Sequence, residues 1–268
     1  MQKVILITGV STGFGNHTAK LLAQKGHKVY GTVRKEAEID SSVTILKMDL
    51  TDVDSIQSAV AKVLQAEGRI DVLINNAGMH TGGAIETTPI ENAKKQLDTN
   101  VMGMVYMLRE VLPAMRKQGQ GTIINFSSIG GLMGLPFQGF YSASKFAIEG
   151  LSEALRMELK EFNIKVIVIN PGDFHTNNTL NRRNFLNSGV SDPYDTQFRK
   201  SLSIIEQDEN NGWPPEKLAR KIIQIVDSKH PAPRYVIASF EQKLAVVIKK
   251  ILPVNLFMSI LGSHYGIK

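Results

Sequence analysis

The chain has 268 residues, 43% of them hydrophobic, no cysteine and a formal net charge of +6. The lack of cysteine excludes disulfides and thiolate metal sites, and no apolar run reaches the length of about 18 residues that a membrane span requires. The positive residues are scattered along the chain, which argues for solvated lysines rather than for nucleic-acid binding.

Apolar, β-rich runs alternate with helical patterns along the whole chain, which predicts one α/β sheet rather than segregated layers. No linker, low-complexity tract or repeat divides the chain, so we expect a single domain over residues 1–268. The first run starts at Val4, so we expect no signal peptide and a cytoplasmic protein. No cluster of His, Asp and Glu has metal-ligand spacing, so we expect no catalytic metal. The predicted strands are Val4–Ile7, Lys28–Val33, Val43–Met48, Val72–Asn75, Thr122–Phe126, Val166–Ile169 and Tyr235–Ala238.

A glycine-rich turn follows the first strand. Gly9, Gly13 and Gly15 precede a helical pattern that Gly26 ends, and the second strand comes next. Such a turn lets the backbone bend tightly and lets a pyrophosphate lie against amide N–H groups at a helix N-terminus. The spacing is T-G-x-x-x-G-x-G rather than G-x-G-x-x-G. Taken alone, a turn of this kind is as often a structural loop.

Polar groups and tight turns also follow other predicted strands, at the carboxyl ends where open α/β sheets bind ligands. Asp49 follows the third strand, although it could instead cap the next helix, as Thr51 or Asp52 could. The other two groups are the run Asn75-Asn76-Ala77-Gly78 and the pair Pro171-Gly172, with Thr176 shortly after.

Ser128, Tyr141 and Lys145 form a candidate proton-transfer group. A tyrosine and a lysine four residues apart share one face of a helix, and a nearby ammonium favours the phenolate, so the phenol can act as a general acid or base. Ser128 can supply a hydroxyl at the same point. An exposed amphipathic pair is the ordinary alternative for Tyr141 and Lys145. Asn100 lies within the helical pattern Leu97–Met115, where asparagine lowers helix propensity and therefore requires a reason.

Together these elements resemble the classical short-chain dehydrogenases/reductases, in order and in spacing. The resemblance extends from Val4 to about Thr176, roughly two thirds of the chain. It implies a single Rossmann-type, doubly wound α/β domain with a seven-stranded parallel sheet flanked by helices. It also implies an oxidoreductase that transfers a hydride between a nicotinamide cofactor and a carbonyl or alcohol substrate.

The resemblance assigns roles to the matching residues. Tyr141 is the general acid, Ser128 polarises the substrate oxygen, Lys145 lowers the phenol pKa and binds the nicotinamide ribose, and Asn100 completes a proton relay. His80 and His175 lie beside the motifs and are expected to be ordinary loop residues. The residues expected to bind the cofactor are Gly9, Ser11, Gly13, Phe14, Gly15, Arg34, Asp49, Leu50, Asn76, Ala77, Gly78, Tyr141, Lys145, Pro171, Gly172 and Thr176.

The end of the second strand predicts a preference for NADP(H) over NAD(H). NAD-specific members place an acid there, which binds the ribose 2′-hydroxyl and repels a 2′-phosphate. This chain has Val33 followed by Arg34, whose guanidinium can bind a phosphate bidentately. The alternative is that Arg34 and Lys35 are merely a solvated pair.

Residues 173–211 correspond to the variable substrate lid of the family. Apolar residues there favour a lipophilic ketone, aldehyde or alcohol, and the C-terminal tail is similar to that of hydroxysteroid- and retinol-type members. The direction of the reaction stays open. The apolar lid residues are Phe174, Leu180, Phe185, Leu186, Tyr194 and Phe198, among Arg182 and Arg183.

The tail, residues 240–268, contains two short amphipathic segments separated at Pro253. We expect it to pack over the substrate cleft or against a neighbouring subunit, with peripheral membrane contact as the less favoured alternative. The apolar faces of the helical patterns Leu97–Met115 and Tyr141–Glu161 predict a homodimer or homotetramer.

A catalytically silent NADP-binding sensor on the same fold is the alternative function. Such proteins typically lose the tyrosine, lysine or serine of the active site, and this chain retains all three. The extended, nucleotide-sugar type of the family carries T-G-x-x-G-x-x-G, which the glycine turn does not match.

Overall fold

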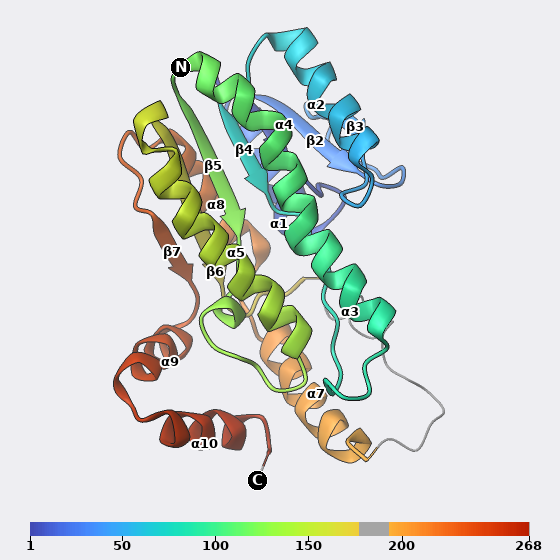
Figure 1. Cartoon of the computed structure of the whole chain (residues 1–268), viewed down its shortest axis with the longest axis vertical. Coiled ribbons are helices and arrows are strands. Elements are labelled where there is room, and N and C mark those ends of the chain that lie inside the picture. Colours follow the sequence, from blue (N-terminus) through green and yellow to red (C-terminus); the bar gives the residue numbers. More distant parts are fainter. Residues whose placement is uncertain (177–192, 268) are drawn as a thin grey trace.

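A parallel sheet of seven strands forms the centre of the described chain, residues 1–176 and 193–267 of the computed structural model (Figure 1). The strand order is β3-β2-β1-β4-β5-β6-β7, so the order reverses between β1 and β4, the position at which doubly wound sheets bind ligands. The predicted Rossmann-type fold is therefore confirmed. The strands are β1 (Val4–Ile7), β2 (Lys28–Val33), β3 (Thr44–Lys47), β4 (Val72–Asn75), β5 (Gly121–Phe126), β6 (Ile164–Pro171) and β7 (Arg234–Ile237).

Helices cover both faces of the sheet (Figure 1). Side chains alternate along each strand, so Leu6 packs toward α2, α4 and α5, whereas Ile5 and Ile7 pack toward α1 and α8. Because both faces are covered, the strands are apolar throughout rather than alternating. The α-helices are α1 (Gly13–Gln24), α2 (Val53–Glu67), α3 (Ile90–Leu97), α4 (Gly103–Gln118), α5 (Gly139–Glu158), α7 (Asp195–Asn210), α8 (Pro215–Asp227), α9 (Phe240–Ile251) and α10 (Val254–His264).

The C-terminal helices α9 and α10 lie beyond the end of the sheet (Figure 1). Val246 of α9 and Phe257 of α10 pack into a third hydrophobic cluster with Ile129, Met133 and Leu135. A capping box at Ser239 starts α9, and Pro253 separates the two helices, as the sequence predicts. Within the described residues, no helix combines the length and the apolarity needed to cross a membrane.

The helix expected over Leu97–Met115 differs from the prediction. The helical segment begins earlier, at Ile90, and widens into a π-helix over Asp98–Met102 before α4 continues to Gln118. A π-turn of this kind often marks a functional site. Here it contains Asn100, the residue whose presence in a helix interior required a reason.

Most residues that predicted an assembly surface belong to the core. On α4, Met104, Met107, Leu108 and Val111 are all at most 7% exposed, and on α5 Ile148 is buried as well. These side chains pack against the sheet, so their apolarity does not require a partner subunit. The homodimer or homotetramer stays a prediction, without support from these buried positions.

The described part of the expected lid, residues 173–176 and 193–211, consists largely of α7. Phe174 is buried in the core, where its ring meets that of Phe14 edge-on with centroids 5.0 Å apart, and Phe198 packs against Phe137. Phe174 is therefore a core residue rather than a lid anchor. Other predicted lid residues lie outside the described residues, namely Leu180, Arg182, Arg183, Phe185 and Leu186.

Candidate active site

A cavity lies at the carboxyl end of the sheet, where the chain leaves strands β1 to β6. It brings together residues from Gly9 to Glu209, and all but two of the predicted site residues line it. The predicted residues in its wall are Gly9, Ser11, Gly13, Phe14, Arg34, Asp49, Leu50, Asn76, Ala77, Gly78, Ser128, Tyr141, Lys145, Pro171, Gly172 and Thr176.

The glycine turn shapes one end of this cavity. Gly9 and Gly13 have φ of +72° and +59°, a backbone conformation that favours glycine, and a Cβ on Gly9 would lie 2.7 Å from that of Ala77. α1 starts at Gly13 with no side-chain cap from Thr12 and no acid in its first turn. Its N-terminal amide groups therefore offer the cavity an anion-binding position that suits a pyrophosphate.

Gly15 does not line the cavity. A Cβ there would lie 2.1 Å from the Gly9 carbonyl oxygen and 2.5 Å from the Asn76 Nδ2 atom. The Asn76 amide also donates to the carbonyl oxygens of Thr8 and Gly9, each at 2.9 Å. Gly15 thus permits α1 and Asn76 to pack closely against the turn. This packing stabilises the turn on the side that faces away from the cavity.

Asp49 and Arg34 form the opposite end of the cavity. Asp49 accepts hydrogen bonds from the Thr51 backbone and hydroxyl at 2.9 and 2.8 Å. Burial opposes its ionisation, but these bonds and the charges of Arg34 and Lys95 outweigh burial and hold the pKa of Asp49 below its ordinary value. Asp52, not Asp49, caps α2, so the capping alternative for Asp49 does not hold.

Lys145 lies at the floor of the cavity, on the first half of α5. Its Nζ donates to the Phe126 carbonyl at 2.8 Å and lies 5.6 Å from the centroid of the Tyr141 ring. Burial lowers the pKa of Lys145 to about 8, against the opposing effect of the Glu149 carboxylate. A substantial fraction of Lys145 is therefore charged at pH 7, within reach of the phenol whose ionisation an ammonium favours.

Ser128 stands in the same wall, at the end of β5. Its Oγ accepts from the Gly130 backbone N–H at 3.1 Å, so the hydroxyl hydrogen can be donated to a ligand. The neighbouring Ser127 donates instead to the Lys145 carbonyl at 3.3 Å. Tyr141 and Ser128 together line a smaller lobe next to the main cavity, which gives a carbonyl substrate space beside both.

A network of buried polar side chains fixes the backbone at Ser128. The Asn170 amide donates to the Ser128 carbonyl at 2.9 Å and to the Glu149 carboxylate at 2.5 Å. Arg234 pairs with the other Glu149 oxygen at 2.7 Å. This network ties the ends of β5 and β6 to α5, which fixes Ser128 relative to Lys145.

Asn100 is buried and, like Gly15, does not line the cavity. Its side chain accepts from the Met79 N–H at 2.8 Å and donates to the Met79 carbonyl at 3.0 Å and to Ser144 at 3.1 Å. Met79 does line the cavity. In this structure Asn100 therefore holds the segment after Gly78, and the π-turn directs its side chain there.

His80 is the main feature that the sequence did not predict. Its ring stacks on Tyr141, with centroids 3.9 Å apart and planes inclined by 18°, and it is buried in the wall of the smaller lobe. It is therefore not the ordinary loop residue that was expected. The sequence offered one signal for His80, which is its position just after the N-N-A-G turn. Its stacking on Tyr141, 61 positions away, depends on the fold and could not be predicted.

Several further residues complete the cavity. Glu209, from α7, is buried and lines both the main cavity and the smaller lobe. It lies within residues 173–211, the expected lid, but no motif in the sequence distinguishes Glu209 from the other residues of this segment. The other residues in the wall of the main cavity that were not predicted are Thr12, Thr32, Val33, Met48, Met79, Thr99, Phe126, Ser127, Asp173 and Phe174.

Comparison with known proteins agrees with this geometry. The family model described as short chain dehydrogenase matches residues 3–187. The chain belongs to this family. A solved short-chain dehydrogenase from Streptomyces avermitilis has the same fold over 98% of this chain and 97% of its own, with a TM-score of 0.81 and 29% identity. The chain is accordingly an oxidoreductase that acts on carbonyl or hydroxyl groups.

Two curated relatives of the present chain carry names that state an activity. A 3-ketodihydrosphingosine reductase from Bacteroides thetaiotaomicron is 47% identical over 266 residues, 99% of both chains. An NADPH-dependent 3-dehydrocapnine reductase from Ornithobacterium rhinotracheale is 32% identical over 250 residues, 88% of both chains.

Proposed function

We propose that the protein is an NADPH-dependent reductase that converts the ketone of a long-chain amino ketone, of the 3-ketodihydrosphingosine type, to an alcohol. The observation that carries the proposal is the 47% identity, over 99% of both chains, to the reductase of that name. The cavity supports it, because Ser128, Tyr141 and Lys145 line one wall.

The cofactor, when bound, supplies the hydride. The residues of the chain then have three tasks: Tyr141 donates a proton to the carbonyl oxygen, Ser128 donates a hydrogen bond to the same oxygen, and the Lys145 ammonium favours the phenolate that remains. His80 holds the phenol ring by stacking. The glycine turn, Asp49 and Arg34 would hold the phosphates and adenosine.

A substrate panel tests this proposal. Purified protein is incubated with NADPH and 3-ketodihydrosphingosine, a steroid ketone, a retinoid aldehyde or a simple ketone, and the absorbance of the reduced cofactor is followed. We expect the amino ketone to give the highest kcat/KM. NADPH binding without turnover of any member of the panel would contradict the proposal and favour a sensor.

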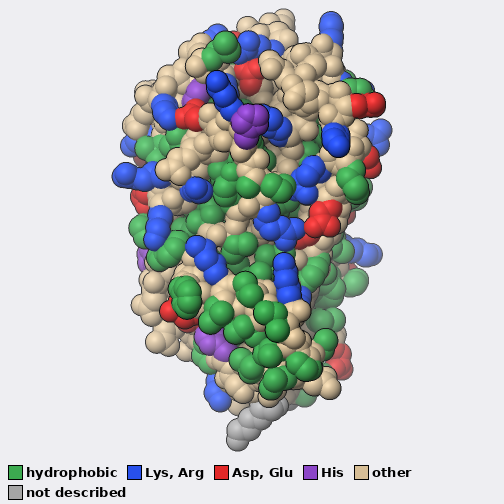
Figure 2. All heavy atoms as spheres, turned by 90° about the vertical axis from the view of Figure 1, so that its left-hand side faces the viewer, with side chains coloured by type: hydrophobic (Ala, Val, Ile, Leu, Met, Phe, Trp, Pro, Cys, Tyr) green, Lys and Arg blue, Asp and Glu red, His purple; other side chains and the backbone are tan. Residues whose placement is uncertain are grey.

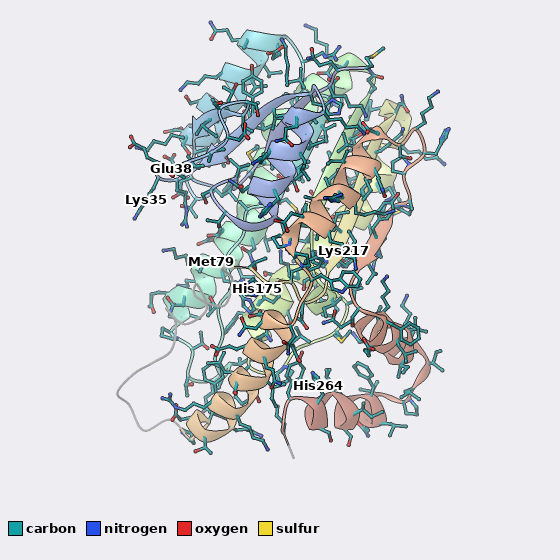
Figure 3. All side chains as sticks on the ribbon, turned by 180° about the vertical axis from the view of Figure 1, so that it is seen from behind. Lys35, Glu38, Met79, His175, Lys217 and His264 are labelled. Carbon is teal, nitrogen blue, oxygen red and sulfur yellow. The ribbon has the colours of Figure 1, made fainter. Side chains whose placement is uncertain are left out.

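Arg34 is proposed to set the preference for NADPH. Arg34→Ala should raise the KM for NADPH about tenfold or more, because one charge-assisted, bidentate phosphate contact is lost, and should change the KM for NADH little. Lys35→Ala is the matched control, since Lys35 lies at the outer edge of the molecule (Figure 3). Steady-state kinetics with both cofactors checks this, and equal kcat/KM for NADPH and NADH in the native enzyme would refute it.

Glu209 is proposed to bind the amine of the substrate. In 3-ketodihydrosphingosine a primary amine is attached to the carbon beside the carbonyl, and Glu209 lines the lobe that Ser128 and Tyr141 share. Glu209→Gln should raise the KM for this amino ketone about tenfold, from the loss of one charged hydrogen bond, and leave the KM for a long-chain ketone without the amine unchanged. Glu206→Gln, on the same helix, is the control. An equal effect on both substrates would refute amine recognition.

A further inference from the structure

The outward side of α9 carries a continuous apolar stripe. Phe240, Leu244, Val247 and Ile251 recur at intervals of four, three and four residues, which is the period of one helix face. Their exposed fractions lie between 43% and 74%. On the opposite side of the helix, Val246 packs into the third hydrophobic cluster. Both the buried and the solvent-facing sides of α9 are therefore apolar.

α10 continues this apolar surface. Phe257 is its buried residue, and no charged side chain precedes His264 in the helix. A helix that is apolar around most of its circumference is ordinarily buried on all sides, yet α10 is covered only on the side of Phe257, and its outward side is exposed in the described structure. The side chains of α10 that are at least half exposed are Val254, Leu256, Met258 and Ile260.

These eight side chains of α9 and α10, the α9–α10 face, are concentrated within residues 240–260. Eighteen large hydrophobic residues of the described chain are exposed, and this short segment holds eight of them. Figure 2, which shows the side of the molecule that carries both helices, has hydrophobic side chains gathered at its lower end. Scattered exposure is normal for a soluble protein, whereas a contiguous patch indicates an interaction site.

Cations border the α9–α10 face. Lys243 and Lys250 are both exposed and stand seven residues apart on α9, so they form a row beside the apolar stripe. Lys249 turns inward instead, where its Nζ donates to the Leu132 carbonyl. Glu241 is the one acid of α9, and α10 has none. The apolar surface is thus flanked by positive charge, as Figure 2 shows for the same side of the molecule.

We propose that the α9–α10 face is a docking surface for membranes that contain anionic lipid. Apolar side chains of such a face enter the boundary between headgroups and acyl chains, while flanking lysines meet lipid phosphates. A second copy of the chain fits less well as the partner. A two-fold contact would bring the same patch of both copies together, so the lysines of one copy would face the lysines of the other, with only Glu241 of each copy to offset the repulsion.

Docking would also place the active site near the lipid. Tyr265 directly follows α10 and lines the smaller lobe together with Tyr141 and Ser128, and its carbonyl accepts from Ser201 of α7 at 2.7 Å. A long-chain substrate could then pass between bilayer and cavity over a short distance. This consequence rests on the proposed function, whereas docking does not.

Co-sedimentation of the full-length protein with vesicles tests the proposal without a substrate. With vesicles of phosphatidylcholine and phosphatidylglycerol at low salt, most of the protein should sediment, and less should do so at high salt or with phosphatidylcholine alone. Protein that stays in the supernatant with the anionic vesicles at low salt would overturn the proposal. So would equal binding to the neutral vesicles.

Matched variants locate the contact. Val254→Glu should reduce vesicle binding at least tenfold, whereas Met157→Glu should not, although these two side chains are 75% and 73% exposed. A glutamate at the first position of α10 suits the helix dipole, and an unchanged unfolding midpoint verifies the fold. Equal binding by Val254→Glu and the native protein would overturn the proposal. A smaller particle mass for this variant by light scattering would also overturn it, and would identify a contact between copies instead.

The lysine row has its own control. Lys243→Gln/Lys250→Gln should weaken binding to the anionic vesicles about tenfold and remove most of its salt dependence. Lys62→Gln/Lys117→Gln makes the same change of net charge at exposed positions on α2 and α4 and should behave like the native protein. Equal loss in both double variants would show non-specific attraction to net charge and overturn the proposed contact.

Discussion

Tyr141→Phe should lower kcat by two to four orders of magnitude, the range by which a positioned general acid accelerates a reaction. The phenylalanine ring keeps the stacking on His80 and the shape of the cavity wall, but no proton reaches the carbonyl oxygen from this position. NADPH affinity should change less than about threefold, because the glycine turn, Arg34 and Asp49 remain. Single-turnover absorbance and a fluorescence titration of NADPH separate the two effects.

Tyr106→Phe is the matched control for this experiment. Tyr106 lies on α4, packs against the core and does not line the cavity, so its phenol has no place in the reaction. Its variant should retain native turnover. Near-native kcat in Tyr141→Phe would mean that another group is the acid, and would remove the role proposed for Tyr141.

The sequence was sufficient to predict the place of a residue in the fold where a local pattern determines that place. Gly9 and Gly13 could be assigned to the turn because a tight turn favours glycine; in the structure both have positive φ, and Gly9 also lies too close to Ala77 for a Cβ. Tyr141 and Lys145 could be placed on one face because the helical period is fixed. The alternating apolar runs predicted one α/β sheet, and the family resemblance implied its seven parallel strands; the strand order comes from the structure.

Elsewhere the outcome depends on tertiary contacts that no local pattern contains. His80 and Glu209 reach the cavity from separate segments, and neither belongs to a motif. Asn100 was noticed for its low helix propensity, but its hydrogen bonds to Met79 depend on the π-turn. The apolar stripe of α4 could be read as core or as an interface, because both bury the same residue types. The apolar stripe of α9 is equally ambiguous in the sequence, but in the structure it is exposed rather than buried in the core.

Lys145 shows how function opposes stability in this cavity. Burial lowers its pKa to about 8 from an ordinary value near 10.5, so the folded protein binds fewer protons than the unfolded chain between these two pH values. Stability of the cofactor-free protein therefore rises with pH across this window, and the full cost of the buried ammonium is present below pH 8. A shift of this size corresponds to about 3 kcal/mol, and a replacement of the lysine would lose the hydrogen bond to the Phe126 carbonyl, which offsets part of the gain.

Lys145→Met should accordingly raise the free energy of unfolding of the cofactor-free protein at pH 7 by about 2 kcal/mol, because a flexible apolar side chain replaces a buried charge. The same variant should lose both turnover and NADPH affinity, since the lysine serves the phenol and the cofactor. Urea unfolding at pH 7 and pH 10 measures the first effect, and the advantage of the variant should shrink toward pH 10 as the native lysine loses its proton. Lys62→Met, at an exposed position on α2, should change neither stability nor turnover. If Lys145→Met instead lowered stability by the same amount at both pH values, the buried ammonium would not be the source of the cost.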